Sequence, residues 1–176
     1  MARIFAPTSP EVTSRETRHM EKVRRIAAEG MVLLENKGVL PLKADGRALA
    51  VFGNGVRKMV KGGTGSGDVN SRTVINIEQG LEEAGFTIAT KPWLDRFDQA
   101  CADYGAQYMG EFAAILKEQG FAGVNWALEN PYRDPDVPVI TPEDMAATDR
   151  SLALYVIART SGEGADRKLD GGDWAL

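Results

Sequence analysis

The sequence predicts an α/β fold in which a mostly parallel sheet is flanked by helices, incomplete at its carboxyl-terminal end. Short apolar runs rich in β-branched and aromatic residues, at 48–52, 86–90 and 152–158, alternate with stretches of helical periodicity. Such alternation implies parallel strands joined by right-handed crossovers. Three strands are fewer than a finished doubly wound sheet needs, and the 176-residue chain stops soon after the third. We therefore expect a truncated domain.

The first helix is predicted from its start signal and its apolar face. Residues 1–12 contain two prolines and are expected to form an extended leader. Thr13 and Glu16 then form a capping box, which predicts a helix start. Gly38 is the expected stop. Apolar residues at spacings of three and four give one apolar stripe along this helix: Met20, Val23, Ala27, Met31 and Leu34.

The middle of the chain predicts two strands and two helices. The run 48–52 is apolar throughout, as expected for a strand buried on both faces. A helix marked by Val74, Ile77, Leu81 and Ala84 should end at Gly85, before the short strand at 86–90. A long helical pattern follows over 92–119, where two glycines could kink or split it. Its apolar side consists of Leu94, Phe97, Cys101, Tyr104, Tyr108, Phe112 and Ile115.

The last third predicts an irregular loop, a short helix and a strand. Residues 120–141 show no clear periodicity. Thr141 followed by Pro142 and two acids is a strong helix start. The strand at 152–158 is expected to be buried and to deliver the loop 159–167 at its carboxyl end, where open α/β sheets bind ligands.

Composition narrows the class of protein. With 43% hydrophobic and 26% charged residues, the chain resembles a soluble globular domain. A net charge of -4 without a basic cluster argues against nucleic acid as a partner. One cysteine, Cys101, excludes an internal disulfide, and one histidine, His19, argues against serine-histidine chemistry and zinc sites. No signal peptide and no membrane-spanning run is present, so we expect a cytoplasmic protein without a membrane partner.

The glycine-rich stretch 62–67 does not fit a nucleotide. A Walker loop needs Lys and then Ser or Thr after its last glycine, whereas Asp68 and Val69 follow here. The dinucleotide fingerprint also fails in register. We therefore expect no nucleotide cofactor. Asp68 and Asn70 instead suit a neutral, hydroxyl-rich ligand, since carboxylate and amide oxygens accept hydrogen bonds from hydroxyls.

Other candidate ligand contacts are weaker. Trp126, Tyr132 and Trp174 could offer flat faces to sugar rings, although core or loop packing is the commoner role of such residues. Asp166, Asp170 and Asp173 could be imagined as metal ligands. Because Arg167 and Lys168 lie among them, we expect no metal site.

A carboxylate between two glycines marks the loop after the last strand. Glu163 lies between Gly162 and Gly164, and glycines let a ligand approach the main chain closely. The alternative is a solvated loop without function. Arg159 and Arg167 lie close to it in the sequence, and we expect acidic neighbours, Asp166 among them, to pair with these arginines.

Four motifs together resemble glycoside hydrolase family 3, the β-glucosidase type. They are EGMVLLEN before LPL (29–42), VFG (51–53), GGTGSGDVN (62–70), and RTSGEGADR followed by GDW (159–174). They occur in the family's order and span nearly the whole chain after the leader. The resemblance implies that residues 13–176 are a partial α/β-sandwich domain, which the family pairs with a (β/α)8 barrel.

The resemblance also implies roles for individual residues. It implies a retaining mechanism with two carboxyl groups, in which an aspartate of the barrel is the nucleophile and Glu163 is the acid/base. The substrate-binding positions that it implies are Gly65, Ser66, Asp68, Arg159, Asp166 and Arg167. The substrate would be a β-linked oligosaccharide or glycoside, with no cofactor and no metal.

The resemblance leaves several questions open. The short leader resembles family members of reversed domain order, so we expect the barrel to follow residue 176 and the isolated chain to be inactive. The sugar, the linkage and the oligomeric state stay open. Two alternatives remain: a non-catalytic carbohydrate-binding or interaction module with the same fold, and a nucleotide-binding regulatory domain, against which the glycine-rich stretch argues.

Overall fold

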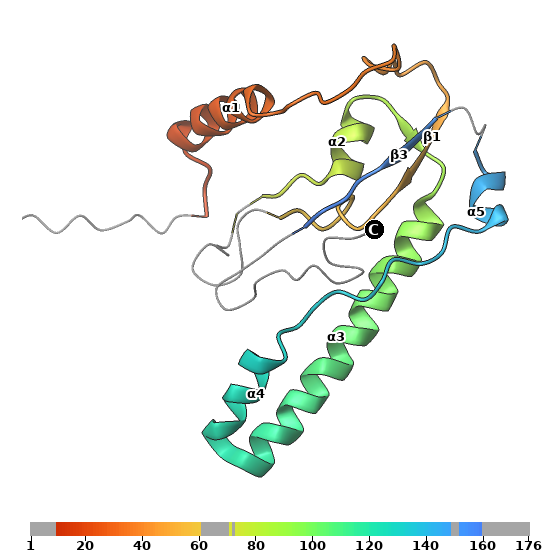
Figure 1. Ribbon diagram of the computed structural model, residues 1–176. Coiled ribbons are helices and arrows are strands. Elements are labelled where there is room, and N and C mark those ends of the chain that lie inside the picture. The colour runs from red at the N-terminus through yellow and green to blue at the C-terminus, as the bar shows by residue number, and fades with distance from the viewer. Residues whose placement is uncertain (1–9, 61–70, 72, 149–151, 160–176) are drawn as a thin grey trace, which may run out of the picture. The chain divides into compact units, whose positions relative to one another are not determined.

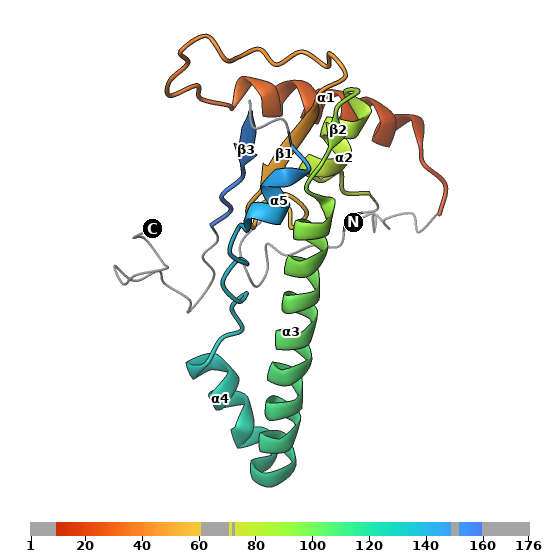
Figure 2. The same cartoon turned by 90° about the vertical axis from the view of Figure 1, so that its right-hand side faces the viewer.

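The chain folds around a small parallel sheet. The computed structural model describes residues 10–60, 71, 73–148 and 152–159, and the chain divides into two compact units, residues 1–43 and 44–176. The second unit holds strands β1 (Ala48–Phe52), β2 (Thr87–Ile88) and β3 (Ala153–Tyr155) in the order β2-β1-β3 (Figures 1 and 2). Both pairings are parallel, which confirms the predicted α/β class. The leader at 1–12 and the domain at 13–176 stay predictions.

Strand β1 forms the core because its side chains are apolar on both faces. Leu49 to Phe52 are all buried. Trp93, the largest fully buried side chain, contacts the Phe52 ring edge-on, with 5.2 Å between ring centroids and an interplanar angle of 90°. Such edge-to-face pairs are favourable because the positive edge of one ring meets the negative face of the other. The expected burial of this strand on both faces is confirmed.

A buried threonine extends the hydrogen bonding between β1 and the segment that follows β2. Strand pairing on that side ends at Leu49 and Ile88. Beyond it, the Thr90 hydroxyl accepts a hydrogen bond from Val51 N (2.8 Å) and donates one to Val51 O (2.6 Å). Thr90 is only 2% exposed, so no water can replace these bonds. One side chain therefore continues the ladder where the short strand β2 has ended.

The predicted helix stop at Gly85 and the predicted helix start at Thr141 are confirmed. Asn76 and Gln79 form a capping box before α2 (Ile77–Glu83), and Gly85 with a φ of +88° reverses the chain after it. Thr141 caps the short helix α5 (Pro142–Ala146) in the same way, as expected. Helix α3 (Lys91–Gln119) continues unbroken through both of its interior glycines. None of the helices in the described ranges is apolar over enough length to cross a bilayer.

The prediction of an irregular loop at 120–141 is wrong for its first half, because residues 120–129 are helical. A 3-10 turn η1 (Gly120–Gly123) leads into α4 (Val124–Glu129), and Figures 1 and 2 show α4 beside the carboxyl-terminal half of α3. The Trp126 ring stacks on Phe112 at 6.3 Å and lies 5.4 Å from Tyr108. This contact with α3 stabilises a helix too short to reveal itself by periodicity.

The first unit contains α1 (Ser14–Glu29), which starts at the predicted capping box and ends earlier than predicted. The helix stops at Gly30, so Met31 and Leu34 do not continue its apolar face. Glycine is a poor helix former. The Asn36 side chain also accepts hydrogen bonds from three following backbone amides, at 3.0 to 3.1 Å, and holds residues 36–40 in a turn.

Strand β3 lies where it was predicted, although its burial differs from the prediction. It covers only Ala153–Tyr155 of the expected 152–158, and its side chains are exposed and half-buried in alternation. Leu154 and Val156 pack against the core, whereas Tyr155 is 49% and Ile157 50% exposed. The run is apolar on both faces, but among the described residues only one face is covered.

Replacing Thr90 by Val tests the side-chain ladder. The change keeps the shape and leaves the buried amide and carbonyl of Val51 without this partner, so the free energy of unfolding should fall by about 1–3 kcal/mol in urea. Thr87→Val, on the exposed face of β2, is the matched control and should change it by less than about 0.5 kcal/mol. Equal effects of the two substitutions would contradict the role of Thr90.

Candidate functional site

Two segments leave the sheet side by side at its carboxyl edge. Because β1 and β3 are parallel, residues 53–60 and residues 156–159 begin at the same edge. The first segment leads toward the glycine-rich stretch, and the second leads toward Glu163. The structure thus brings together the starts of both loops that the sequence singled out.

Two glycines allow the segments to touch. A Cβ added to Gly53, whose φ is +105°, would lie 2.1 Å from Val156 O, and one added to Gly55 would lie 2.8 Å from the Val156 side chain. Both distances are below any tolerated contact, so only glycine fits at either position. The close approach permits a hydrogen bond of 3.1 Å from Gly55 N to Val156 O.

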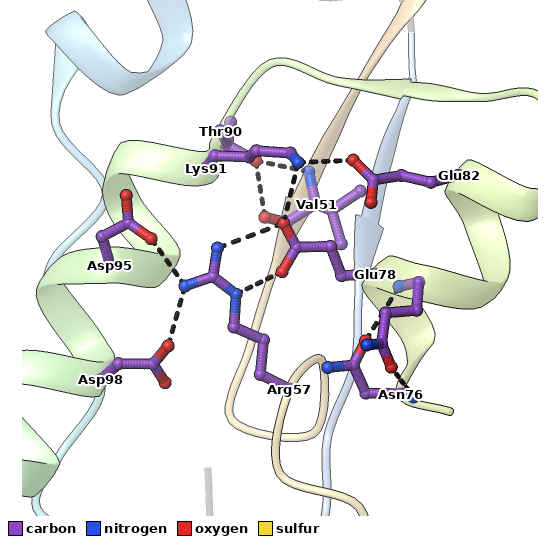
Figure 3. A network of polar contacts seen from close by, with 10 residues as sticks. Val51, Arg57, Asn76, Glu78, Glu82, Thr90, Lys91, Asp95 and Asp98 are labelled. Atoms are coloured by element: carbon purple, nitrogen blue, oxygen red, sulfur yellow. Dashed lines mark hydrogen bonds and ion pairs between the residues drawn. The ribbon is translucent and has the colours of Figure 1, made fainter. Parts of the chain in front are cut away.

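Arg57 anchors the first segment to two helices. Its guanidinium pairs with Glu78 of α2 through two nitrogens, and Nη1 lies 2.7 Å from Asp95 and 2.8 Å from Asp98 of α3 (Figure 3). The arginine side chain is 20% and that of Glu78 9% exposed, so the pair is shielded from water. Hydrogen bonding to Glu78 raises the pKa of Arg57 above its ordinary range.

The same network holds the Glu78 carboxylate ionised. Its hydrogen bonds with Arg57 lower the pKa of Glu78 below the ordinary value of 4.5, although burial opposes this shift. Lys91 lies 3.3 Å from Glu78 and also pairs with Glu82. Figure 3 shows the arginine between α2 and α3, with the lysine on the far side of Glu78.

The next residue, Lys58, is anchored in another direction. Its Nζ lies 2.6 Å from Asp134 and 6.0 Å from the centroid of the Phe97 ring. Burial alone would lower the pKa of Lys58, but the hydrogen bonds and charge interactions with Asp134 and Cys101 together outweigh it, so the pKa is raised. Tyr132 donates a hydrogen bond to the same carboxylate at 3.1 Å. Two consecutive cations therefore fix the chain just before the glycine-rich stretch.

The described ion pairs balance most of the positive charge near this edge. Arg57 and Lys91 face four carboxylates, those of Glu78, Glu82, Asp95 and Asp98, and Lys58 is matched by Asp134. Arg57, Lys58 and Lys91 are therefore neutralised by the protein's own acids. Phosphate binding needs uncompensated positive charge or free amides.

One of the predicted site residues lies in the described part of the chain. Arg159 is half-buried, directly after the segment that touches Gly53 and Gly55. The others lie outside the described residues: Gly65, Ser66, Asp68, Glu163, Asp166 and Arg167. No group of three residues able to hold a metal ion occurs within the described ranges.

The aromatic residues considered as sugar platforms have other partners. Trp126 packs on α3, and the Tyr132 ring lies 5.5 Å from that of Tyr108 while its hydroxyl is hydrogen-bonded to Asp134. Their role in the described structure is packing between α3 and the segment after it. Trp174 lies outside the described residues.

Sequence reasoning missed Asn54, Arg57 and Glu78. A signal for Asn54 was present, because it lies between two glycines just after a strand, as Glu163 does later in the chain. For Arg57 the only local signal was a basic pair next to a glycine-rich stretch. Its three partners lie 21 to 41 residues away and could not be inferred from spacing.

Comparison with known proteins finds close matches over nearly the whole chain. Residues 31–175 match the Glycosyl hydrolase family 3 C-terminal domain. The chain is 34% identical to Beta-glucosidase A of Butyrivibrio fibrisolvens over 98% of its own length and 19% of the relative's. It is 33% identical to a Beta-glucosidase of Ruminococcus albus over 90% of the chain and 15% of that protein.

Solved structures of a beta-glucosidase also superpose on this chain. Beta-glucosidase 3B from Thermotoga neapolitana, in complex with glycerol, superposes with a TM-score of 0.59 at 28% identity, over 89% of this chain and 20% of that one. The same enzyme in complex with α-D-glucose gives a TM-score of 0.58 at 27% identity, over 92% and 20%. The chain therefore spans about a fifth of the length of the proteins it resembles.

Glu78→Gln tests the network around Arg57 through pH. Since the folded-state pKa of Glu78 is lowered, its contribution is fully present above about pH 4.5 and is lost as the pH falls through the folded value. At pH 7 the variant should lose roughly 1.5–3 kcal/mol of unfolding free energy. The gap to the wild type should narrow as the pH falls below about 4.5, because the unfolded wild type then binds a proton at Glu78, and should close below the lowered folded-state pKa.

Glu83→Gln on the exposed side of α2 is the control for this titration. It removes a carboxylate from the same helix without touching Arg57, and its unfolding curve should follow the wild type at each pH. A gap between wild type and Glu78→Gln that stays constant from pH 7 to pH 3 would contradict the lowered pKa of Glu78.

Proposed function

Because the chain belongs to the family of glycosyl hydrolase family 3 C-terminal domains, we propose that it forms part of a retaining β-glycosidase of the β-glucosidase type. In this proposal the complete enzyme hydrolyses terminal β-linked sugars from oligosaccharides or glycosides. This chain supplies the loop with the acid/base, Glu163, and a barrel domain outside this chain supplies the nucleophile.

The observation that carries the proposal is the family match, which includes both stretches that the sequence singled out. It covers residues 31–175 and so includes the glycine-rich stretch and Glu163. Both matched curated relatives are named beta-glucosidases, and the matched enzyme from Thermotoga neapolitana was solved with glycerol and with α-D-glucose. Neutral polyols of this kind suit the charge balance around Arg57 and Lys58.

A retaining mechanism divides the work between two carboxyl groups about 5–5.5 Å apart. One attacks the anomeric carbon and forms a glycosyl-enzyme intermediate. The other first protonates the departing oxygen and then removes a proton from the attacking water. We assign the second role to Glu163.

The other loop residues have supporting roles in this proposal. Gly65, Ser66 and Asp68 would contact sugar hydroxyls through main-chain amides and the carboxylate. Asp166 would pair with Arg159 or Arg167, which keeps positive charge away from Glu163. The negative field of the barrel's nucleophile would then raise the pKa of Glu163 toward the working pH.

The whole protein's activity depends on parts outside this chain. The relatives are five or more times longer than the region that matches them. We propose that the isolated chain is inactive, because the nucleophile would lie in the barrel domain. A cytoplasmic location stays a prediction of the sequence.

Glu163→Gln in the full-length gene product tests the acid/base role. Hydrolysis of alkyl β-glucosides, whose leaving groups need a proton, should fall by roughly 100- to 10,000-fold. Activated aryl β-glucosides, whose leaving groups depart without one, should lose far less. Azide should restore their turnover, because it attacks the intermediate without a base.

The matched control is Glu83→Gln, which should leave both reactions unchanged. Equal losses on alkyl and aryl substrates after Glu163→Gln would rule out the acid/base role. If the full-length protein bound glycosides and did not hydrolyse them, the alternative of a non-catalytic carbohydrate-binding module would hold instead.

A further inference from the structure

Asn54 joins the two segments that leave the carboxyl edge of the sheet. Its side-chain Nδ2 donates a hydrogen bond to Ala158 O at 2.9 Å, and its Oδ1 accepts one from Ala158 N at 2.8 Å. One amide group thus satisfies both backbone polar groups of a residue 104 positions away in the sequence. Strand pairing has already ended at Tyr155, so this contact extends the ladder beyond it.

The neighbours of Asn54 serve the same contact. The glycine on each side is required by the close approach of residues 156–158, since a Cβ added to Gly53 would overlap Val156 O and one added to Gly55 would lie 3.1 Å from Ala158 N. Residues 53–55 therefore all contact residues 156–158. These three residues form a clamp on that segment.

An amide is the side chain suited to the central position of this clamp. Asn carries a donor and an acceptor in one plane, whereas an ionised Asp carries acceptors only and would face the Ala158 carbonyl with like charge. Alanine would leave both groups of Ala158 to water. Asn54 and Ala158 are both half-buried, so water could take over these bonds without unfolding the sheet.

The clamp acts on the segment that carries the proposed acid/base. Ala158 precedes Glu163 by five residues, a reach of at most about 18 Å when fully extended. Strand β3 is itself held by pairing with β1 and by the bond from Gly55 N to Val156 O. Asn54 therefore adds little to the strand, and what it fixes is the point from which the loop departs.

We infer that Asn54 is a positioning residue for Glu163, holding the start of the acid/base loop against the end of strand β1. The inference rests on the proposed function, because it assigns Asn54 a role in placing that acid. A misplacement of a catalytic group by about 1 Å can cost 100-fold in rate. Loss of the clamp should therefore appear in catalysis more than in folding.

Amide hydrogen exchange of the 176-residue chain tests the clamp itself. In Asn54→Ala, the Ala158 amide should exchange at least about tenfold faster, since it loses its acceptor, while amides of β1 keep their protection. Asn130→Ala is the matched control: it removes another side-chain amide, one that donates to Trp126 O at 2.9 Å, far from this edge. Unchanged protection of Ala158 in Asn54→Ala would overturn the inference.

The catalytic test uses the full-length gene product with three substitutions in parallel. Asn54→Ala should reduce kcat on alkyl β-glucosides by about 10- to 100-fold, with KM changed less than about threefold. The loss on activated aryl β-glucosides should be smaller, and azide should restore part of it. Glu163→Gln should show the same pattern more strongly, and Asn130→Ala should show none.

The pattern separates the two hypotheses. If Glu163→Gln discriminates between the substrates and Asn54→Ala lowers both equally or neither, the positioning role is wrong while the proposed function stands. If Glu163→Gln does not discriminate, both are wrong. Should Asn54→Ala fail to fold, Asn54→Asp, which keeps the acceptor for Ala158 N, must show the same selective loss. Failure of both variants to fold would make Asn54 a folding determinant and overturn the inference.

Discussion

The pairing of strand β1 (Ala48–Phe52) on both of its edges is the constraint on which the rest of the second unit depends. Its two partners are very short, and each pairing is lengthened by one polar side chain. Thr90 extends the ladder with β2 by binding the amide and carbonyl of Val51. Asn54 extends the ladder with β3 by binding those of Ala158. The bonds of Asn54 hold residue 158 beside the segment that follows β1.

The packing of the sheet against α2 and α3 also determines how Arg57 is paired. Burial against α2 and α3 would make Arg57 costly if it were unpaired, and three carboxylates around it offset that cost. The consequence reaches the proposed chemistry, because a neutralised edge does not compete with a sugar for its hydrogen-bonding groups. In the proposed mechanism, the negative charge of the second carboxylate is then what raises the pKa of the general acid.

The sequence predicted those elements whose signals are local. The capping box at Thr13, the helix start at Thr141, the stop at Gly85 and the doubly buried run of β1 are confirmed. Predictions failed where distant contacts decided the outcome. Helix α4 exists because Trp126 packs on α3, and β3 is half-exposed because the described residues cover one of its faces. Neither contact leaves a mark on the spacing of nearby residues.

The sequence by itself determined the class of fold and the alternation of strands and helices that implies a parallel sheet, because these depend on periodicity. It also determined the family, because the motifs that identify it are contiguous in the chain. Only the tertiary structure decided that Asn54 binds Ala158, and that Arg57 lies among Glu78, Asp95 and Asp98. Hydrogen bonds and ion pairs between distant residues depend on which side chains the packed sheet and helices bring within about 3 Å. That proximity is a property of the packed core and not of any stretch of sequence.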